Sequence, residues 1–164
     1  MTFTTDRFTN PTSTFDIVSS TLATFKRLST DDQLGLLWVL YENMGGAITP
    51  AAPGAARLQL AAGLLERVKS MSFQEQLQVQ RDLADKVETP ETRAYGVLSN
   101  NNKLAFWFQL GEWMRSGEAV PVPANYKLSL DANRVFDQIA RLEFNQQITI
   151  LRQAVVNMGI DPLA

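Results

Sequence analysis

The chain has 164 residues, of which 45% are hydrophobic, and it contains neither cysteine nor histidine. This length fits one globular domain with a sizeable core. The missing cysteines exclude disulfides, thiolate nucleophiles and iron–sulfur ligation, and the missing histidines remove the usual zinc ligand and the commonest general base. A formal charge of −2, with the basic residues scattered, argues against a broad nucleic-acid-binding face.

The N-terminus, MTFTTDRFTNPTSTF, lacks the positive start and apolar stretch of a secretory signal, so we expect a cytoplasmic protein. The longest nearly unbroken apolar run, at 34–41, is far shorter than the roughly 20 residues of a membrane-spanning helix. We therefore expect a water-soluble protein that does not span a membrane.

Residues 1–13 are polar and predict an N-terminal arm that becomes ordered only if Phe3 and Phe8 dock elsewhere. Residues 14–164 are expected to form a single helical domain. Its first helix should end near Leu28, and spacings of three and four place its apolar residues on one face. These residues are Phe15, Val18, Leu22 and Phe25.

The segment 31–44, DDQLGLLWVLYENM, predicts a central helix that is apolar on more than one face. Ser29 or Thr30 should cap its start. Gly45 and Gly46 should end it, because glycine reaches the left-handed conformation without steric cost.

The segment 48–56, ITPAAPGAA, reads as a connector into a third helix. Ser72 and Glu75 have capping-box spacing at the start of a fourth helix that continues toward Lys86. Thr89 before Pro90 predicts a short fifth helix. The core face of the third helix should carry Leu58, Ala61, Leu64, Leu65 and Val68.

Residues 100–102, three asparagines, predict a turn, followed by a strongly apolar and aromatic helix that ends at Gly117. The next segment, EAVPVPANYKLS, should be an extended connector because Pro121 and Pro123 disfavour a helix.

Two closing helices are predicted at about 130–143 and 145–158. No segment shows the alternation of a half-buried strand, so the sequence predicts an all-α fold of paired or interleaved bundles. The core faces of the closing helices should carry Val135, Ile139, Leu142, Ile148, Leu151, Val155 and Met158.

Carboxylates are the remaining candidates for catalysis. Asp31 with Asp32, or Glu112 with a distant acid, could form an acid/base pair. Such residues usually cap helices or face water. We therefore expect a protein that is not an enzyme and has no metal site.

Aromatic stripes are the most unusual feature. Trp38 and Tyr41 share one helical face, and Trp107 with Phe108, Gly111 and Met114 forms a second stripe. Facing stripes of this kind would suit a long, flat, apolar ligand. An aromatic core is the alternative, and periodicity alone favours the core.

Several blocks of sequence in the same order resemble the N-terminal domain of the orange carotenoid protein. The resemblance spans residues 14–159 and includes DDQLGLLWVLYENMG, ITPAAPGAA, LQLA, NKLAFWFQLGEWM, VPVPANYKLS and QQITILRQAVVNMG. Because nothing follows Ala164, the chain looks like a free-standing helical carotenoid protein of the red carotenoid protein type. The resemblance implies two interleaved four-helix bundles that bind a keto-carotenoid, canthaxanthin or echinenone, without a covalent bond.

The resemblance also implies the residues that contact the pigment. Tyr41 and Trp107 should hold one end ring, and Phe108 stands where the family often has tyrosine, so that a hydroxyl contact is lost. The implied carotenoid-binding residues are Leu34, Leu37, Trp38, Tyr41, Leu104, Trp107, Phe108, Gly111, Met114, Val122, Pro123, Tyr126, Ile148, Thr149 and Met158.

The implied function is constitutive photoprotection, by quenching of singlet oxygen and of antenna excitation, without an attached regulatory domain. Two alternatives stay open: a carrier that passes carotenoid to a C-terminal-domain homologue, and a helical phycobilisome adaptor without pigment. Arg152 stands where the family has an arginine that contacts the regulatory domain and the antenna. It is therefore a candidate contact to the thylakoid-bound phycobilisome or to a separate C-terminal-domain homologue, or a charge without a role.

Overall fold

The structure, a computed structural model, describes the backbone of residues 11–44 and 58–163 and the side chains of 16–44 and 61–163. Within these ranges it is helical and has no strand, which confirms the predicted all-α fold. The helices are α1 (Pro11–Lys26), α2 (Thr30–Met44), α3 (Leu58–Lys69), α4 (Phe73–Asp85), α5 (Pro90–Gly96), α6 (Asn100–Ser116), α7 (Leu130–Ala140) and α8 (Phe144–Val156).

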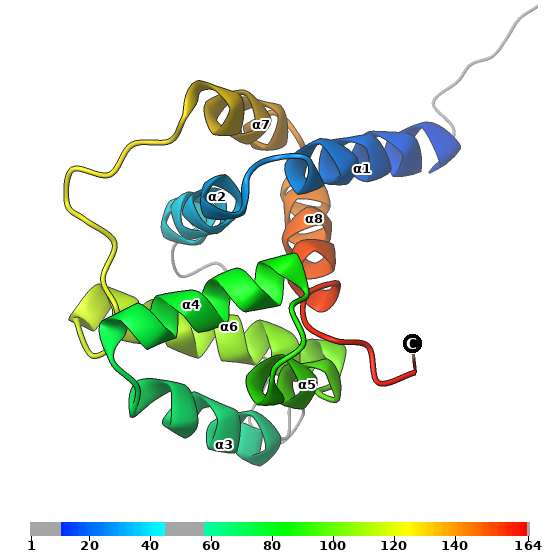
Figure 1. Cartoon of the computed structure of the whole chain (residues 1–164). Coiled ribbons are helices and arrows are strands. Elements are labelled where there is room, and N and C mark those ends of the chain that lie inside the picture. Colours follow the sequence, from blue (N-terminus) through cyan, green and yellow to red (C-terminus); the bar gives the residue numbers. More distant parts are fainter. Residues whose placement is uncertain (1–10, 45–57, 164) are drawn as a thin grey trace, which may run out of the picture.

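The helices pack as two groups of four (Figure 1). The middle of the chain forms one group, in which α3 contacts α4, α5 and α6. The two ends of the chain form the other, in which α1 contacts α7 and α8, and α2 contacts α7. The groups meet where α2 packs against α4 and α6 packs against α8. This arrangement confirms the predicted interleaved four-helix bundles.

Apolar helix faces build the core largely as their spacing predicts. Val18, Leu22 and Phe25 of α1 pack into one hydrophobic cluster with the buried faces of the other helices. The Phe15 and Leu58 side chains lie outside the described residues. On α3 the predicted core face is confirmed by the burial of Ala61, Leu64, Leu65 and Val68.

The predicted helix starts are confirmed by their hydrogen bonds. Ser29 Oγ accepts from a backbone N–H in the first turn of α2. Ser72 and Glu75 form the reciprocal capping box of α4. Thr89 caps α5, whose first residue is Pro90. Each cap satisfies a donor that the first helical turn would otherwise leave unpaired.

The predicted turn at 100–102 is wrong. These three asparagines form the first turn of α6, because Ser99 Oγ accepts from the backbone N–H of Asn102 at 3.2 Å and caps the helix one residue earlier. The predicted end of this helix is confirmed, since Gly117 has a left-handed φ of 83°.

The N-terminal boundary also differs from the prediction. Helix α1 begins at Pro11 and so includes residues 11–13, which were expected in the arm. Proline suits the first helical position, because its missing N–H would be unpaired there. Residues 1–10, with Phe3 and Phe8, lie outside the described residues, as do the connector 48–56 and the glycines Gly45 and Gly46.

The last two helices are shorter than predicted. Helix α7 ends at Ala140, and α8 ends at Val156 because the chain then turns to pack against the middle bundle. There Gly159 N–H donates to Leu83 O at 3.0 Å, and Ile160 N–H donates to Thr92 O at 3.1 Å. A Cβ on Gly96 would lie only 1.7 Å from Ile160 O, so the close approach of this segment requires glycine there.

In the part of the chain that the structure describes, none of the helices combines the length and the apolar character needed to cross a membrane.

Candidate functional site

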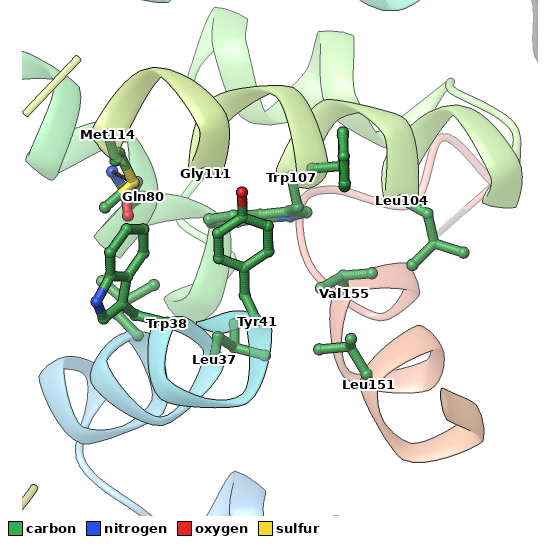
Figure 2. A pocket seen from close by; sticks show the side chains of 12 residues that line it. Leu37, Trp38, Tyr41, Gln80, Leu104, Trp107, Gly111, Met114, Leu151 and Val155 are labelled. Atoms are coloured by element: carbon green, nitrogen blue, oxygen red, sulfur yellow. Dashed lines mark hydrogen bonds between the residues drawn. The ribbon is translucent and has the colours of Figure 1, made fainter. Parts of the chain in front are cut away.

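An apolar pocket lies where the two bundles meet (Figure 2). Its cavity volume is about 70 Å³, and it is partly open to solvent. Four helices, two from each bundle, supply the lining side chains. These are Leu34, Leu37, Trp38 and Tyr41 from α2, Gln80 from α4, Leu104, Trp107, Phe108, Gly111 and Met114 from α6, and Leu151 and Val155 from α8.

All the predicted binding residues of α2 and α6 are among them, so the structure brings both aromatic stripes to one site. On α2, Leu36 and Leu40 are fully buried in the core, whereas Trp38 and Tyr41 are only half-buried because they border the pocket. The helix thus has a core face and a pocket face. The stripes surround open space and are not simply an aromatic core.

Tyr41 is held in place from α6. Its ring centroid lies 5.6 Å from that of Trp38 and 6.1 Å from that of Phe108, the second pair meeting edge to face. Its hydroxyl donates to the Glu112 carboxylate. A Cβ on Gly111 would lie 3.2 Å from Tyr41 Cζ. Gly111 therefore makes room for the Tyr41 ring. The sequence had suggested that the stripe containing Gly111 faces a ligand.

Trp107 is fixed from behind by a buried tyrosine that the sequence analysis did not single out. Trp107 Nε1–H donates to the Tyr95 hydroxyl oxygen at 3.0 Å, and the Tyr95 hydroxyl donates to Val155 O. Tyr95 is fully buried, and this burial raises the pKa of its hydroxyl well above the ordinary value. One neutral hydroxyl thus ties α5 to two walls of the pocket, α6 and α8.

A buried amine lies beside this tyrosine. Lys103 Nζ donates to Val156 O at 3.1 Å and sits 5.4 Å from the centre of the Tyr95 ring. Burial lowers the pKa of the Lys103 amine, while the negative charge of Asp161 opposes that shift.

Three lining residues were missed as site residues: Gln80, Leu151 and Val155. Leu151 and Val155 were expected in the core face of the last helix, and this face also borders the pocket. Gln80 offered a signal, because it is a polar residue on the buried face of α4, 4% exposed. A polar side chain in an apolar stripe commonly has a specific partner.

The predicted connector residues do not line this pocket. Val122 and Tyr126 are half-buried and Pro123 is exposed. Tyr126 packs on the backbone of α2, where a Cβ on Gly35 would lie 1.7 Å from the tyrosine oxygen. A contact between these connector residues and a carotenoid stays a prediction.

The predicted wall residues of the last helix also lie outside the lining. Met158 is buried in the core, and Ile148 is half-buried. Thr149 is exposed, and its hydroxyl donates to Asn145 O one turn earlier. Arg152 is half-buried and donates to Asn101 Oδ1. Their roles toward pigment or partner stay predictions.

The carboxylates considered for catalysis are engaged by neighbours. Arg81 makes a two-pronged contact to Asp31, at 2.9 and 3.1 Å, and Ser129 Oγ donates to Asp32 at 2.8 Å. Glu112 accepts from Tyr41. Among the described residues, no group of three or more acidic side chains is placed to hold a metal ion.

Residues 11–161 match the family model described as orange carotenoid protein, N-terminal. The chain belongs to this family. The predicted resemblance, placed on residues 14–159, is thereby confirmed. A curated relative from Nostoc sp., an orange carotenoid-binding domain-containing protein, is 55% identical over all of this chain and 99% of its own length.

Solved structures show the same fold. The orange carotenoid protein of Anabaena (Nostoc) sp., solved binding canthaxanthin, is 49% identical with a TM-score of 0.84 over 89% of this chain. This chain spans only 46% of that protein. The red carotenoid protein of the same organism, also solved binding canthaxanthin, is 38% identical with a TM-score of 0.75, over 87% of this chain and 97% of that one. The predicted likeness to a red carotenoid protein is confirmed.

Proposed function

We propose that this protein binds a keto-carotenoid non-covalently in the pocket between α2, α4, α6 and α8, and that the complex is photoprotective. The observation that carries the proposal is that both aromatic stripes of α2 and α6 border open space. Family membership supports it, as do the structural relatives solved with canthaxanthin. Canthaxanthin and echinenone are the proposed pigments.

The residues present fit such a pigment. Flat faces of Trp38, Tyr41 and Trp107 are matched to a planar polyene, and leucine and methionine side chains complete an apolar wall. Within the described part of the chain, no charged side chain lines the pocket. A long hydrocarbon would therefore leave water without leaving a charge unpaired.

A bound polyene supplies the photochemistry, by accepting energy from singlet oxygen or from an excited pigment and releasing it as heat. The chain's own residues orient and shield it. Tyr95 holds the Trp107 indole, and Glu112 holds the Tyr41 ring, so two faces of the pocket keep a set geometry. No side chain has to take part in a chemical step, and we propose that the protein is not an enzyme.

Production in cells that make canthaxanthin tests the binding proposal. The purified protein should be orange or red, with absorption shifted from that of free canthaxanthin. A well-folded, colourless product, with helical circular dichroism, would contradict the proposal and favour the pigment-free adaptor.

A carrier is the second candidate function, favoured by the half-burial of Leu34, Trp38 and Phe108, which leaves the pocket open to solvent on one side. Two assays on the coloured protein separate the functions. A quencher protects a chemical trap from photogenerated singlet oxygen in proportion to bound pigment. A carrier passes canthaxanthin to a C-terminal-domain homologue and leaves the trap poorly protected.

The phycobilisome and a separate C-terminal-domain homologue are the proposed protein partners, with Arg152 as the contact. Wild type should then co-sediment with isolated phycobilisomes, or co-elute with the homologue, more strongly than an Arg152→Ala variant. Equal binding by the two proteins would remove Arg152 from the interface.

A further inference from the structure

Gln80 is a polar side chain of the pocket that has no oxygen or nitrogen partner among the described residues. Two of the other three polar groups in the lining are committed elsewhere, because the Tyr41 hydroxyl donates to Glu112 and the Trp107 N–H donates to Tyr95. The third is the Trp38 indole N–H, which is a donor only and donates to no group among the described residues. Gln80 Nε2 has only the thioether sulfur of Met114, at 3.8 Å. No hydrogen bond within residues 16–44 and 61–163 satisfies its carbonyl oxygen.

A second buried glutamine on the same face of α4 shows what a structural amide looks like here. Gln76 lies four residues before Gln80 and is 1% exposed, against 4% for Gln80. Gln76 Nε2 donates to Lys69 O at 3.4 Å and to Met71 O at 3.2 Å, and its Oε1 accepts from Val120 N–H at 2.6 Å. Gln76 therefore joins α4 to two neighbouring segments, whereas Gln80 joins α4 to nothing comparable.

Among the described residues, the buried side-chain atom without a partner is Asn102 Oδ1 and not an atom of Gln80, so the Gln80 amide is not sealed in the core. An occupant that displaces water from the pocket must offer this amide a partner, because a buried amide without one costs free energy. Thioether sulfur is a weak acceptor and does not replace an oxygen. Figure 2 shows Gln80 beside Met114, on the same side of the view as Trp38 and away from Leu104 and Leu151. The amide thus sits toward one end of the pocket, where an end ring of a long ligand would lie.

We propose that the Gln80 carboxamide donates a hydrogen bond to a keto oxygen on an end ring of the bound carotenoid, and thereby selects oxygen-bearing carotenoids over hydrocarbon ones. This inference rests on the proposed function. The apolar walls bind the polyene that all carotenoids share. Gln80 discriminates among them, because a hydrocarbon ring at this position offers the amide no partner, whereas a keto oxygen accepts from the amide N–H.

Competition between two pigments tests the proposal. Pigment-free protein is mixed with equal amounts of canthaxanthin and the hydrocarbon β-carotene in detergent, re-purified, and its bound pigments are extracted and separated. Wild type should be enriched in canthaxanthin. In Gln80→Met, whose side chain is close to glutamine in size, the ratio of bound canthaxanthin to bound β-carotene should fall roughly three- to tenfold. The absorption maximum of bound canthaxanthin should move in Gln80→Met, while that of bound β-carotene should not.

Gln74→Met is the matched control, because it makes the same chemical change on the exposed face of α4 and should keep the wild-type ratio. Gln80→Leu, checked by circular dichroism, repeats the test should the first variant misfold. A wild-type ratio in a folded, coloured Gln80 variant overturns the role of Gln80 and leaves carotenoid binding intact. The same holds if wild type takes up both pigments equally, as expected if a water satisfies the amide. A wild type that takes up neither pigment overturns the proposed function, and this inference with it.

Discussion

Tyr95 positions two walls of the pocket through a single hydroxyl group. Its hydroxyl accepts from Trp107 on α6 and donates to Val155 O on α8, so it sets the distance between two walls of the pocket. Three aromatic rings pack edge to face in sequence here, from Tyr95 through Phe106 to Trp107. The fully buried tyrosine acts from α5, outside the pocket lining, through the residues that it holds.

Replacing Tyr95 by phenylalanine should therefore affect both stability and colour. The indole N–H and the Val155 carbonyl lose their partner, which should lower the free energy of unfolding by about 1–3 kcal/mol in urea titration. The freed Trp107 ring should also shift the absorption of bound canthaxanthin. Tyr126→Phe is the stability control, since the structure gives its hydroxyl no hydrogen bond among the described residues. A Tyr95→Phe protein as stable as this control would contradict the network.

Tyr95 should also make stability fall at high pH. Burial raises the pKa of its hydroxyl in the folded state above the ordinary value of 10.0, so the unfolded chain loses this proton first. The stability that depends on the neutral hydroxyl is complete below about pH 10 and declines as the pH rises above it. Urea unfolding at about pH 8 and about pH 11 should show a larger loss for wild type than for Tyr95→Phe.

The comparison with Tyr95→Phe is needed because Lys103 acts in the opposite direction. Burial lowers the pKa of Lys103, so its contribution to the free energy of unfolding increases as the pH rises toward 10.5, the ordinary value for a lysine. Both proteins keep Lys103, and the difference between them isolates Tyr95. Equal losses would show that the phenol is not the group responsible.

At the scale of helices, the contact between α2 and α6 decides the shape of the pocket. The Tyr41 ring of α2 lies against the backbone of α6 at Gly111, and its hydroxyl reaches Glu112 one residue further on. The Arg115 guanidinium lies 5.1 Å from the ring centre. Close approach at one glycine thus places an aromatic face at the pocket wall.

Gly111→Ala should disturb pigment binding more than folding. The new Cβ would lie 3.2 Å from Tyr41 Cζ, close enough to push the ring by a few tenths of an ångström. Alanine is also the better helix former by roughly 0.5–1 kcal/mol, which offsets part of the strain. We expect a near-wild-type free energy of unfolding with reduced uptake of canthaxanthin or shifted absorption.

Gly63→Ala on α3 is the matched control for this change, because its new Cβ would meet nothing within 4 Å. It should stabilise the protein slightly and leave pigment uptake unchanged. If Gly111→Ala also takes up canthaxanthin with an unchanged spectrum, the packing of Tyr41 on Gly111 does not govern the pocket.

At the scale of the molecule, the pocket joins the two bundles, since α4 and α6 come from one and α2 and α8 from the other. A ligand there should stabilise both bundles together. At a free canthaxanthin concentration of 100 times the dissociation constant, the free energy of unfolding should be about 2.7 kcal/mol higher than that of pigment-free protein. Urea unfolding followed by circular dichroism should show one transition moved to higher urea, whereas identical midpoints would contradict binding between the bundles.

The sequence predicted features that depend on near neighbours in the chain. The caps at Ser72 and Thr89 involve partners three residues away, and Gly117 ends α6 through its own backbone conformation. Their physical causes are local, so spacing reveals them. The prediction of a turn at Asn100 was wrong for a local reason too. Ser99, the residue before it, caps the helix and so places Asn100 in its first turn.

Composition and periodicity by themselves determined an all-α chain without cysteine or histidine chemistry, and the order of its motifs pointed to the family. Only the tertiary structure decided that the stripes of Trp38 and Trp107 border a pocket, that Gln80 lines it and that Tyr95 holds the Trp107 indole. Tyr95 and Val155 are 60 residues apart in the chain. Helical spacing says which side chains share a face, but what that face meets depends on how helices from both ends of the chain pack against the middle.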